Sequence, residues 1–139
     1  MKNALFAFWT FILLADIALA ETNKKITTED IPGPAKCYFD AVAKKVLNVL
    51  GDCFQTDAVI VDVNREIAGI RAIRNWAEDE VFGGRYEILK IVSQKKGFIK
   101  LLIRFVPPGL WGKLSKGFKA HYTFEISNGK IIKMDLQYA

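Results

Sequence analysis

Few side chains in this sequence are suited to covalent or metal chemistry. The chain has one histidine, His121, and two cysteines, Cys37 and Cys53. A structural zinc site of the Cys/His type takes four such ligands, so we expect no metal centre of this kind. The chemistry is left to carboxylates and phenols. Asp62 directly follows a β-branched run, where it could act as an acid or base, or could simply cap the turn that follows.

The length and the composition limit the class of protein. The 139 residues suffice for one domain, and 51% hydrophobic with 25% charged residues is typical of a globular chain. The formal charge of +5 is modest. A segment over 88–124 holds basic residues and no acids, but no nucleic-acid recognition motif accompanies it. We therefore expect a solvated basic surface and no nucleic-acid partner.

The first twenty residues have the pattern of a secretory signal peptide. A basic start at Lys2 is followed by an apolar run and by an A-x-A ending at Ala20. The alternative is a membrane anchor, but the run is shorter than the about 20 apolar residues of a spanning helix and contains Asp16. We expect cleavage after Ala20, a flexible segment over 21–34, and a secreted or periplasmic protein without membrane attachment.

Export would place Cys37 and Cys53 in an oxidising compartment, where disulfides form and persist. The alternative is a pair of buried free thiols, because cysteine is among the residue types most often buried. The spacing of the two residues does not decide between a disulfide and two thiols.

Hydrophobic periodicity indicates the elements that position these residues. Apolar residues recur at helical spacing over 35–54, which predicts one long helix, or two helices with a bend near 44–45. A second helical pattern begins at Ile70, with apolar residues on one face up to Ala77, and the glycines of the segment 81–84 end it. Alternating or β-branched runs predict strands over 58–61, 66–68, 86–93, 98–106, 118–126 and 131–138. Hairpin turns join most of these strands, so we expect an antiparallel α+β fold.

Alternation in the strands over 118–126 and 131–138 separates an apolar face from a polar one. We expect the helices to cover the apolar face and His121 to point away from it. Ala120 is small among aromatic residues and leaves room either for a ligand or for a helix. The apolar face comprises Phe118, Ala120, Tyr122, Phe124, Ile126, Ile132, Met134, Leu136 and Tyr138.

Four motifs occur in an order and at a spacing that resemble a known family. They are YFDAV at 38–42, DAVIVD at 57–62, GIRAIRNW at 69–76 and GKI at 129–131. Over 35–139 the chain resembles the SnoaL-like branch of the nuclear-transport-factor-2-like superfamily. The resemblance implies a cystatin-like cone, in which a curved antiparallel sheet wraps around N-terminal helices in the order α-α-β-β-α-β-β-β-β. It also implies an apolar pocket open at one end and a homodimer that pairs through the outer sheet face.

Within this superfamily, the ketosteroid isomerases allow a comparison residue by residue. Tyr38 matches the tyrosine that donates a hydrogen bond to the substrate oxygen, and Asp62 matches the aspartate that moves the proton. The second donor of the isomerases, a protonated aspartate, is replaced here by Tyr122. The proline that follows the base is replaced by Val63. We therefore do not expect steroid isomerisation itself.

Two functions follow from the resemblance and stay open. One is an isomerase, cyclase or dehydratase without metal or cofactor that acts on a small hydrophobic carbonyl compound. Asp62 would be its acid or base, and Tyr38 and Tyr122 its hydrogen-bond donors. The other is a non-catalytic module that binds a small hydrophobic molecule or dimerises. In either case we expect ligand contacts from Trp76, Ile103, Trp111, Phe118, Phe124 and Met134.

Overall fold

The computed structural model describes residues 24–109 and 116–139. The expected signal peptide over 1–20 and the expected ligand contact Trp111 lie outside these residues. Within the described ranges, none of the helices has the length and apolar character needed to cross a membrane.

The N-terminal part of the described chain is partly structured. Thr27 caps a 3₁₀ turn, Thr28–Asp30, by accepting a hydrogen bond from the Glu29 backbone N–H at 3.3 Å. Ile31 is 7% exposed and belongs to the core. Helix α1, Gly33–Lys44, begins two residues earlier than the predicted helix. The reason is that Pro34 lies in the first turn, where its missing N–H costs nothing.

The helical region consists of two helices, which settles the alternative left open by the sequence. Helix α1 ends at Lys45, whose backbone is left-handed with φ 55°, and α2 covers Leu47–Cys53. A disulfide joins Cys37 in α1 to Cys53 at the end of α2, with 5.6 Å between the Cα atoms. This crosslink fixes the point at which the chain leaves α2 for the sheet.

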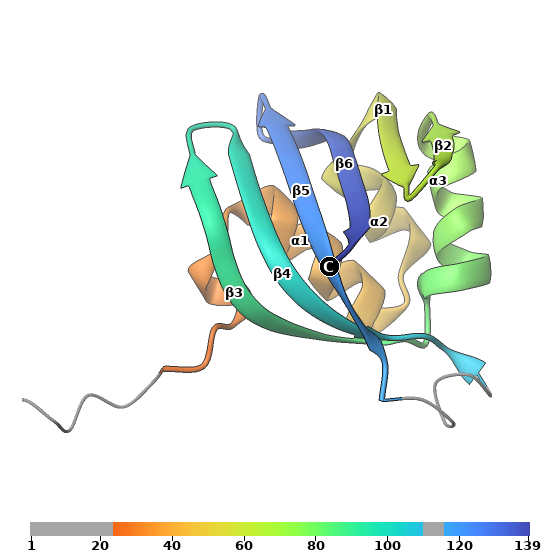
Figure 1. Ribbon diagram of the computed structural model, residues 1–139. Coiled ribbons are helices and arrows are strands. Elements are labelled where there is room, and N and C mark those ends of the chain that lie inside the picture. Colours follow the sequence, from red (N-terminus) through yellow and green to blue (C-terminus); the bar gives the residue numbers. More distant parts are fainter. Residues whose placement is uncertain (1–23, 110–115) are drawn as a thin grey trace, which may run out of the picture.

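Six strands form one sheet in the order β2-β1-β6-β5-β4-β3 (Figure 1). Four of the five pairings are antiparallel, as predicted, but β1 and β6 are parallel, so the sheet is mixed. The element order agrees with the prediction. The strands are β1 Phe54–Asp62, β2 Arg65–Ala68, β3 Arg85–Lys95, β4 Phe98–Val106, β5 Phe118–Ser127 and β6 Lys130–Tyr138, and helix α3, Ile70–Trp76, follows β2.

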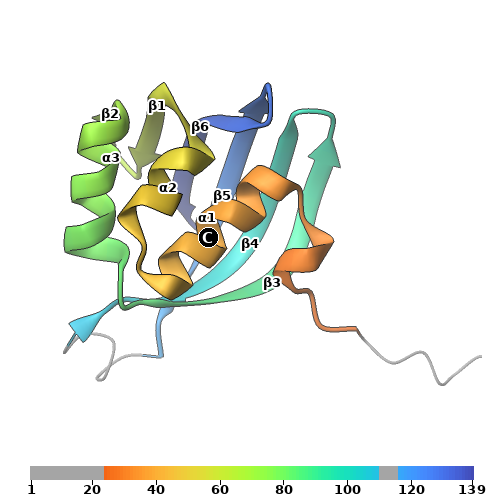
Figure 2. The ribbon, with the colours of Figure 1, turned by 180° about the vertical axis from the view of Figure 1, so that it is seen from behind.

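The helices cover one face of the curved sheet, as Figures 1 and 2 show from opposite sides. The alternation predicted for β4 is confirmed, because every second residue of this strand is buried between sheet and helices. In β5 it holds for Ala120, Tyr122 and Phe124, whereas Phe118 is 37% exposed and Ile126 is only partly buried, near the ends of the strand. Burial of these apolar side chains is the main source of stability. The fully buried side chains of the core include Tyr38, Leu50, Phe54, Ile60, Ile73, Ile99, Leu101, Ile103, Phe124, Ile131 and Met134.

The alternation predicted for the beginning of β6 is wrong. Ile132 belongs to the predicted apolar face, but it is 37% exposed, and its neighbour Ile131 is fully buried. The pairing of β5 with β6 shifts between Glu125 and Ile126, so that one additional residue of β6 is accommodated there. Such a bulge moves the side chains that precede it to the opposite face of the strand.

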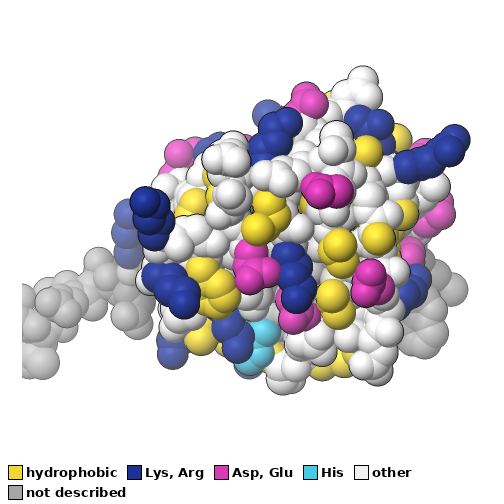
Figure 3. Space-filling view, turned by 90° about the horizontal axis from the view of Figure 1, so that it is seen from above, with side chains coloured by type: hydrophobic (Ala, Val, Ile, Leu, Met, Phe, Trp, Pro, Cys, Tyr) yellow, Lys and Arg dark blue, Asp and Glu magenta, His cyan; other side chains and the backbone are white. Residues whose placement is uncertain are grey.

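On the face seen in Figure 3, lysine and arginine side chains are interspersed with acidic and hydrophobic ones. Two cross-strand pairs of the outer sheet face join opposite charges: Glu87 lies opposite Arg104, and Glu125 opposite Lys133. Charges of both signs at this spacing are typical of a solvated surface.

Candidate functional site

Asp62 is the last residue of β1, and its carboxylate is held by two side chains. Its Oδ2 atom accepts hydrogen bonds from Arg65 Nη2 at 2.6 Å and from Trp76 Nε1 at 3.1 Å. Both donors are side chains, so the hydrogen bonds described for this carboxylate are not those of a turn cap. The same 2.6 Å contact is an ion pair, and a hydrogen bond between two charged groups is stronger than one between neutral groups.

Trp76 reaches Asp62 because of the joint between β2 and α3. Gly69 has φ 86°, a conformation that residues with a side chain rarely adopt, and its N–H donates to Ala58 O at 2.8 Å. Helix α3 therefore starts against β1 and runs along it. Trp76, at the end of α3, is 6% exposed and packs over the end of the strand.

Val63, which follows Asp62, has φ 60°, and a β-branched residue with this backbone conformation stores strain of about 1–3 kcal/mol. Strand β6 holds it in place. The Val63 N–H donates to Leu136 O at 2.9 Å, and its C=O accepts from Gln137 Nε2 at 3.2 Å. The turn that carries Asp62 is thus fixed to the neighbouring strand and not left free at the surface.

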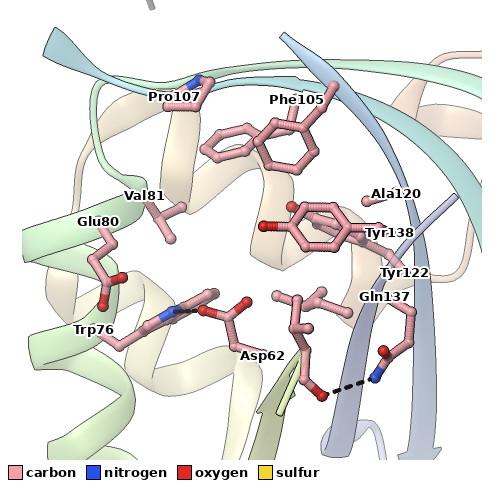
Figure 4. Close-up of a pocket in the computed structure, with 13 residues that line it drawn as sticks. Asp62, Trp76, Glu80, Val81, Phe105, Pro107, Ala120, Tyr122, Gln137 and Tyr138 are labelled. Atoms are coloured by element: carbon pink, nitrogen blue, oxygen red, sulfur yellow. Dashed lines mark hydrogen bonds between the residues drawn. The ribbon is translucent and has the colours of Figure 1, made fainter. Parts of the chain in front are cut away.

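A pocket of about 230 Å³ opens beside Asp62, between the ends of β1, β4, β5 and β6 and the end of α3. Figure 4 shows that one oxygen of Asp62 meets Trp76 while the other points into the pocket. The phenol oxygens of Tyr122 and Tyr138 point into it from the opposite wall. The aromatic side chains that line the pocket are Trp76, Phe105, Phe118, Tyr122 and Tyr138.

A second carboxylate, that of Glu80, lies on the pocket wall because α3 does not end regularly. After Trp76 the chain continues into a π-helical turn, Ala77–Val81, which is rare in proteins and frequent at functional sites. Glu80 Oε1 accepts a hydrogen bond from Arg65 Nη2 at 2.7 Å. Arg65 therefore bridges Glu80 and Asp62, and these two hydrogen bonds raise the pKa of the guanidinium.

Three tyrosines lie one behind another below the pocket. Tyr122 lines the pocket, whereas Tyr38 is fully buried and does not. The hydroxyls of Tyr38 and Tyr86 are 2.8 Å apart and share a hydrogen bond. Burial, followed by the charge of the neighbouring phenol, raises the pKa of Tyr38, Tyr86 and Tyr122 well above the ordinary value of 10. All three phenols are therefore neutral donors at physiological pH.

The structure brings together only part of the predicted site. Asp62, Tyr122, Trp76 and Phe118 line one pocket, but Tyr38 contacts it only through the other tyrosines. The predicted ligand contacts Ile103, Phe124 and Met134 are fully buried in the core and do not line this pocket. The lining side chains that we did not predict include Glu80, Phe105, Gln137 and Tyr138, and Tyr138 could have been found from its place on the predicted apolar face.

The described residues contain no cluster of three or more His, Cys, Asp or Glu side chains that could hold a metal ion. Acid–base chemistry and hydrogen bonding are what the pocket residues can supply.

Comparison of the sequence with family models and with curated proteins gave no match. Solved structures do match. A protein of Sinorhizobium meliloti assigned as a polyketide cyclase superposes with a TM-score of 0.67 at 21% identity, covering 81% of this chain and 100% of that chain. An NTF2-like protein of unknown function from Cytophaga hutchinsonii superposes with a TM-score of 0.65 at 13% identity, covering 85% of this chain and 95% of that chain.

The chain has the NTF2-like fold. A third neighbour is a protein of Catenulispora acidiphila with a ketosteroid isomerase-like fold, solved in complex with trimethylamine. It gives a TM-score of 0.61 at 14% identity and covers 78% of this chain and 86% of that chain. The superpositions show the fold alone, because at these identities a shared fold says nothing of a shared activity.

Proposed function

We propose that the pocket binds a small apolar carbonyl compound and that Asp62 moves a proton on it, in an isomerase, cyclase or dehydratase reaction without metal or cofactor. The observation that carries this proposal is the shared pocket of Asp62 and Tyr122. The second oxygen of Asp62 and the phenol of Tyr122 point into the same apolar space from opposite sides. A base and an oxyanion donor that face each other are what proton abstraction next to a carbonyl requires.

The two groups have separate tasks in this mechanism. Asp62 accepts the proton from the carbon next to the carbonyl, and positioned general bases contribute about 10²–10⁴-fold to rates. Tyr122 donates a hydrogen bond to the oxygen on which negative charge develops, and it is neutral because burial raises its pKa. Arg65 and Trp76 hold the other carboxylate oxygen and so orient the base.

The size of the pocket limits the substrate. Its volume of about 230 Å³ lies below the roughly 300–1,000 Å³ of pockets for drug-sized ligands. We therefore expect a compound about the size of one ring. The polyketide cyclase assignment of the Sinorhizobium meliloti neighbour is compatible with carbonyl chemistry in this fold. The disulfide further supports a mature protein that works outside the cytoplasm, as the first twenty residues predict.

Deuterium exchange tests the proposal without knowledge of the natural substrate. The full chain is incubated with cyclopentanone or cyclohexanone in D₂O, and the loss of the protons next to the carbonyl is followed by ¹H NMR. We expect exchange above the buffer rate, abolished in Asp62→Asn and reduced about 10²-fold in Tyr122→Phe. Asp57→Asn, an exposed aspartate on the same strand, is the matched control and keeps the wild-type rate. Wild-type exchange at the buffer rate, or exchange that survives in Asp62→Asn, contradicts the proposal.

A non-catalytic binding module is the second candidate, and the geometry of Asp62 is the observation that favours it. Arg65 bridges Asp62 and Glu80 at 2.6 and 2.7 Å, an arrangement that stabilises both carboxylates as hydrogen-bond acceptors. In this case the two carboxylates would only accept hydrogen bonds from the ligand, and the ligand would leave the pocket without a chemical change. Saturable ketone binding without deuterium exchange would establish this second function.

A further inference from the structure

From the charges and rings that line the pocket we infer that it takes a compact organic cation, a nitrogen with a permanent positive charge and small alkyl groups. The inference goes beyond the proposed reaction, since it concerns the charge of what enters and holds whether or not Asp62 moves a proton. If the pocket prefers a cation and Asp62 also moves a proton, the substrate is a small carbonyl compound that carries an ammonium group. This statement about the substrate rests on the proposed function.

The first observation is the aromatic wall. Phe105, Phe118 and Tyr138 form a continuous series of edge-to-face contacts, with ring centroids 5.8 Å apart for Phe105 and Phe118 and 5.4 Å apart for Phe118 and Tyr138. Trp76 stands on the facing side of the pocket beside Asp62 (Figure 4). Aromatic faces attract cations, tryptophan most strongly, and the attraction grows when the cation leaves water.

The second observation is the sign of the charges. Asp62 and Glu80 are the ionisable carboxylates among the described lining residues, and none of those lining residues is a lysine or arginine. Arg65 does not line the pocket, and its Nη2 atom is bonded to both carboxylates. One guanidinium thus serves two carboxylates and leaves one negative charge of this group without a counterpart. A cation that enters the pocket supplies the missing positive charge, whereas an anion is repelled by the carboxylates.

The third observation is that the two carboxylates differ in place and exposure. The Asp62 side chain is 25% exposed and points into the pocket, while that of Glu80 is 45% exposed and stands at its rim. Glu80 therefore meets an ammonium group at the entrance and leaves Asp62 for the part of the ligand that lies deeper.

Choline and its neutral carbon isostere, 3,3-dimethyl-1-butanol, test the inference, because they have the same shape and differ in charge. Binding to the full chain is measured by NMR on the indole N–H of Trp76, assigned with Trp76→Phe, and by calorimetry at constant ionic strength. We expect choline to bind at least about tenfold more tightly than the isostere and to shift the Trp76 signal. The comparison uses the wild-type protein, so it does not depend on how any variant folds.

Variants of two adjacent acids provide the control. Glu80→Gln removes the carboxylate at the rim, and we expect it to weaken choline binding at least about threefold with no effect on the isostere. Asp79→Asn removes the same charge from an exposed neighbour in the same turn and leaves choline binding unchanged. Equal affinity for the two probes, an unmoved Trp76 signal, or an equal loss in Asp79→Asn overturns the inference. Choline has no carbonyl group, so these results are separate from those of deuterium exchange.

Discussion

Replacing Tyr86 by phenylalanine is expected to destabilise the protein, because the buried Tyr38 hydroxyl loses its hydrogen-bond partner. Tyr38 is 0% exposed, and its hydroxyl is 2.8 Å from that of Tyr86. Without the Tyr86 hydroxyl, the Tyr38 hydroxyl stays buried and loses this partner. A buried polar group left unsatisfied costs about 1–3 kcal/mol, more than the net value of an ordinary hydrogen bond.

The same reasoning predicts unequal single variants and a double variant that is milder than their sum. Tyr38→Phe lowers the free energy of unfolding by about 0.5–1.5 kcal/mol, the net value of one hydrogen bond. This is less than the loss in Tyr86→Phe, because the Tyr86 hydroxyl that remains still interacts with Tyr122. In Tyr38→Phe/Tyr86→Phe no hydroxyl of the pair is stranded, so the two effects couple by about 1 kcal/mol.

Urea unfolding followed by tryptophan fluorescence gives the four free energies of this cycle. Equal slopes against urea would show that the variants change stability and not the extent of unfolding. Costs of the two single variants that simply add, or a Tyr86→Phe variant as stable as the wild type, would refute the claim that the Tyr38 hydroxyl depends on Tyr86.

Two further predictions concern the whole domain. In Cys37→Ala/Cys53→Ala the disulfide that closes a loop of 16 positions is absent, and we expect the free energy of unfolding to fall by about 3 kcal/mol. Urea unfolding measures this loss, and a loss below about 1 kcal/mol would contradict the prediction. Stability is expected to fall above about pH 10, because the unfolded chain loses its phenol protons there while burial keeps Tyr38, Tyr86 and Tyr122 protonated in the folded state. Urea midpoints between pH 8 and 11 check this, with a shallower decline in Tyr122→Phe, and midpoints that stay constant to pH 11 would contradict the raised pKa values.

Where the sequence has a clean period, it predicts the fold closely. Strand β4 covers Phe98–Val106, as predicted, because buried and partly buried residues alternate along it without exception and Pro107 ends the run. Strand β6 shows the limit. The bulge opposite Ile126 is set by the pairing with β5, and the residues of β6 alone give no sign of it.

The sequence predicts which residue types form the candidate site, but it does not predict which of them reach the pocket and which lie in the closed core. Alternation assigns Tyr122 and Phe124 to the same face, but only the assembled sheet decides that Tyr122 reaches a pocket and Phe124 a closed core. Helical periodicity likewise places Tyr38 on the buried side without showing that Tyr86 separates it from the pocket. The sequence does not place Glu80 at the site, because a regular helix gives its side chain a different direction than the π-helical turn does.

The parallel pairing of β1 with β6 determines when the pocket can exist during protein synthesis. Val63 and Gln137, which are bonded across these strands, lie 74 positions apart in the chain. The helices and the β1–β2 hairpin can form on a nascent chain, but the strained turn after Asp62 has no support until residues 130–138 have been made. Contacts between such distant segments form slowly, so the candidate pocket is completed after the rest of the domain.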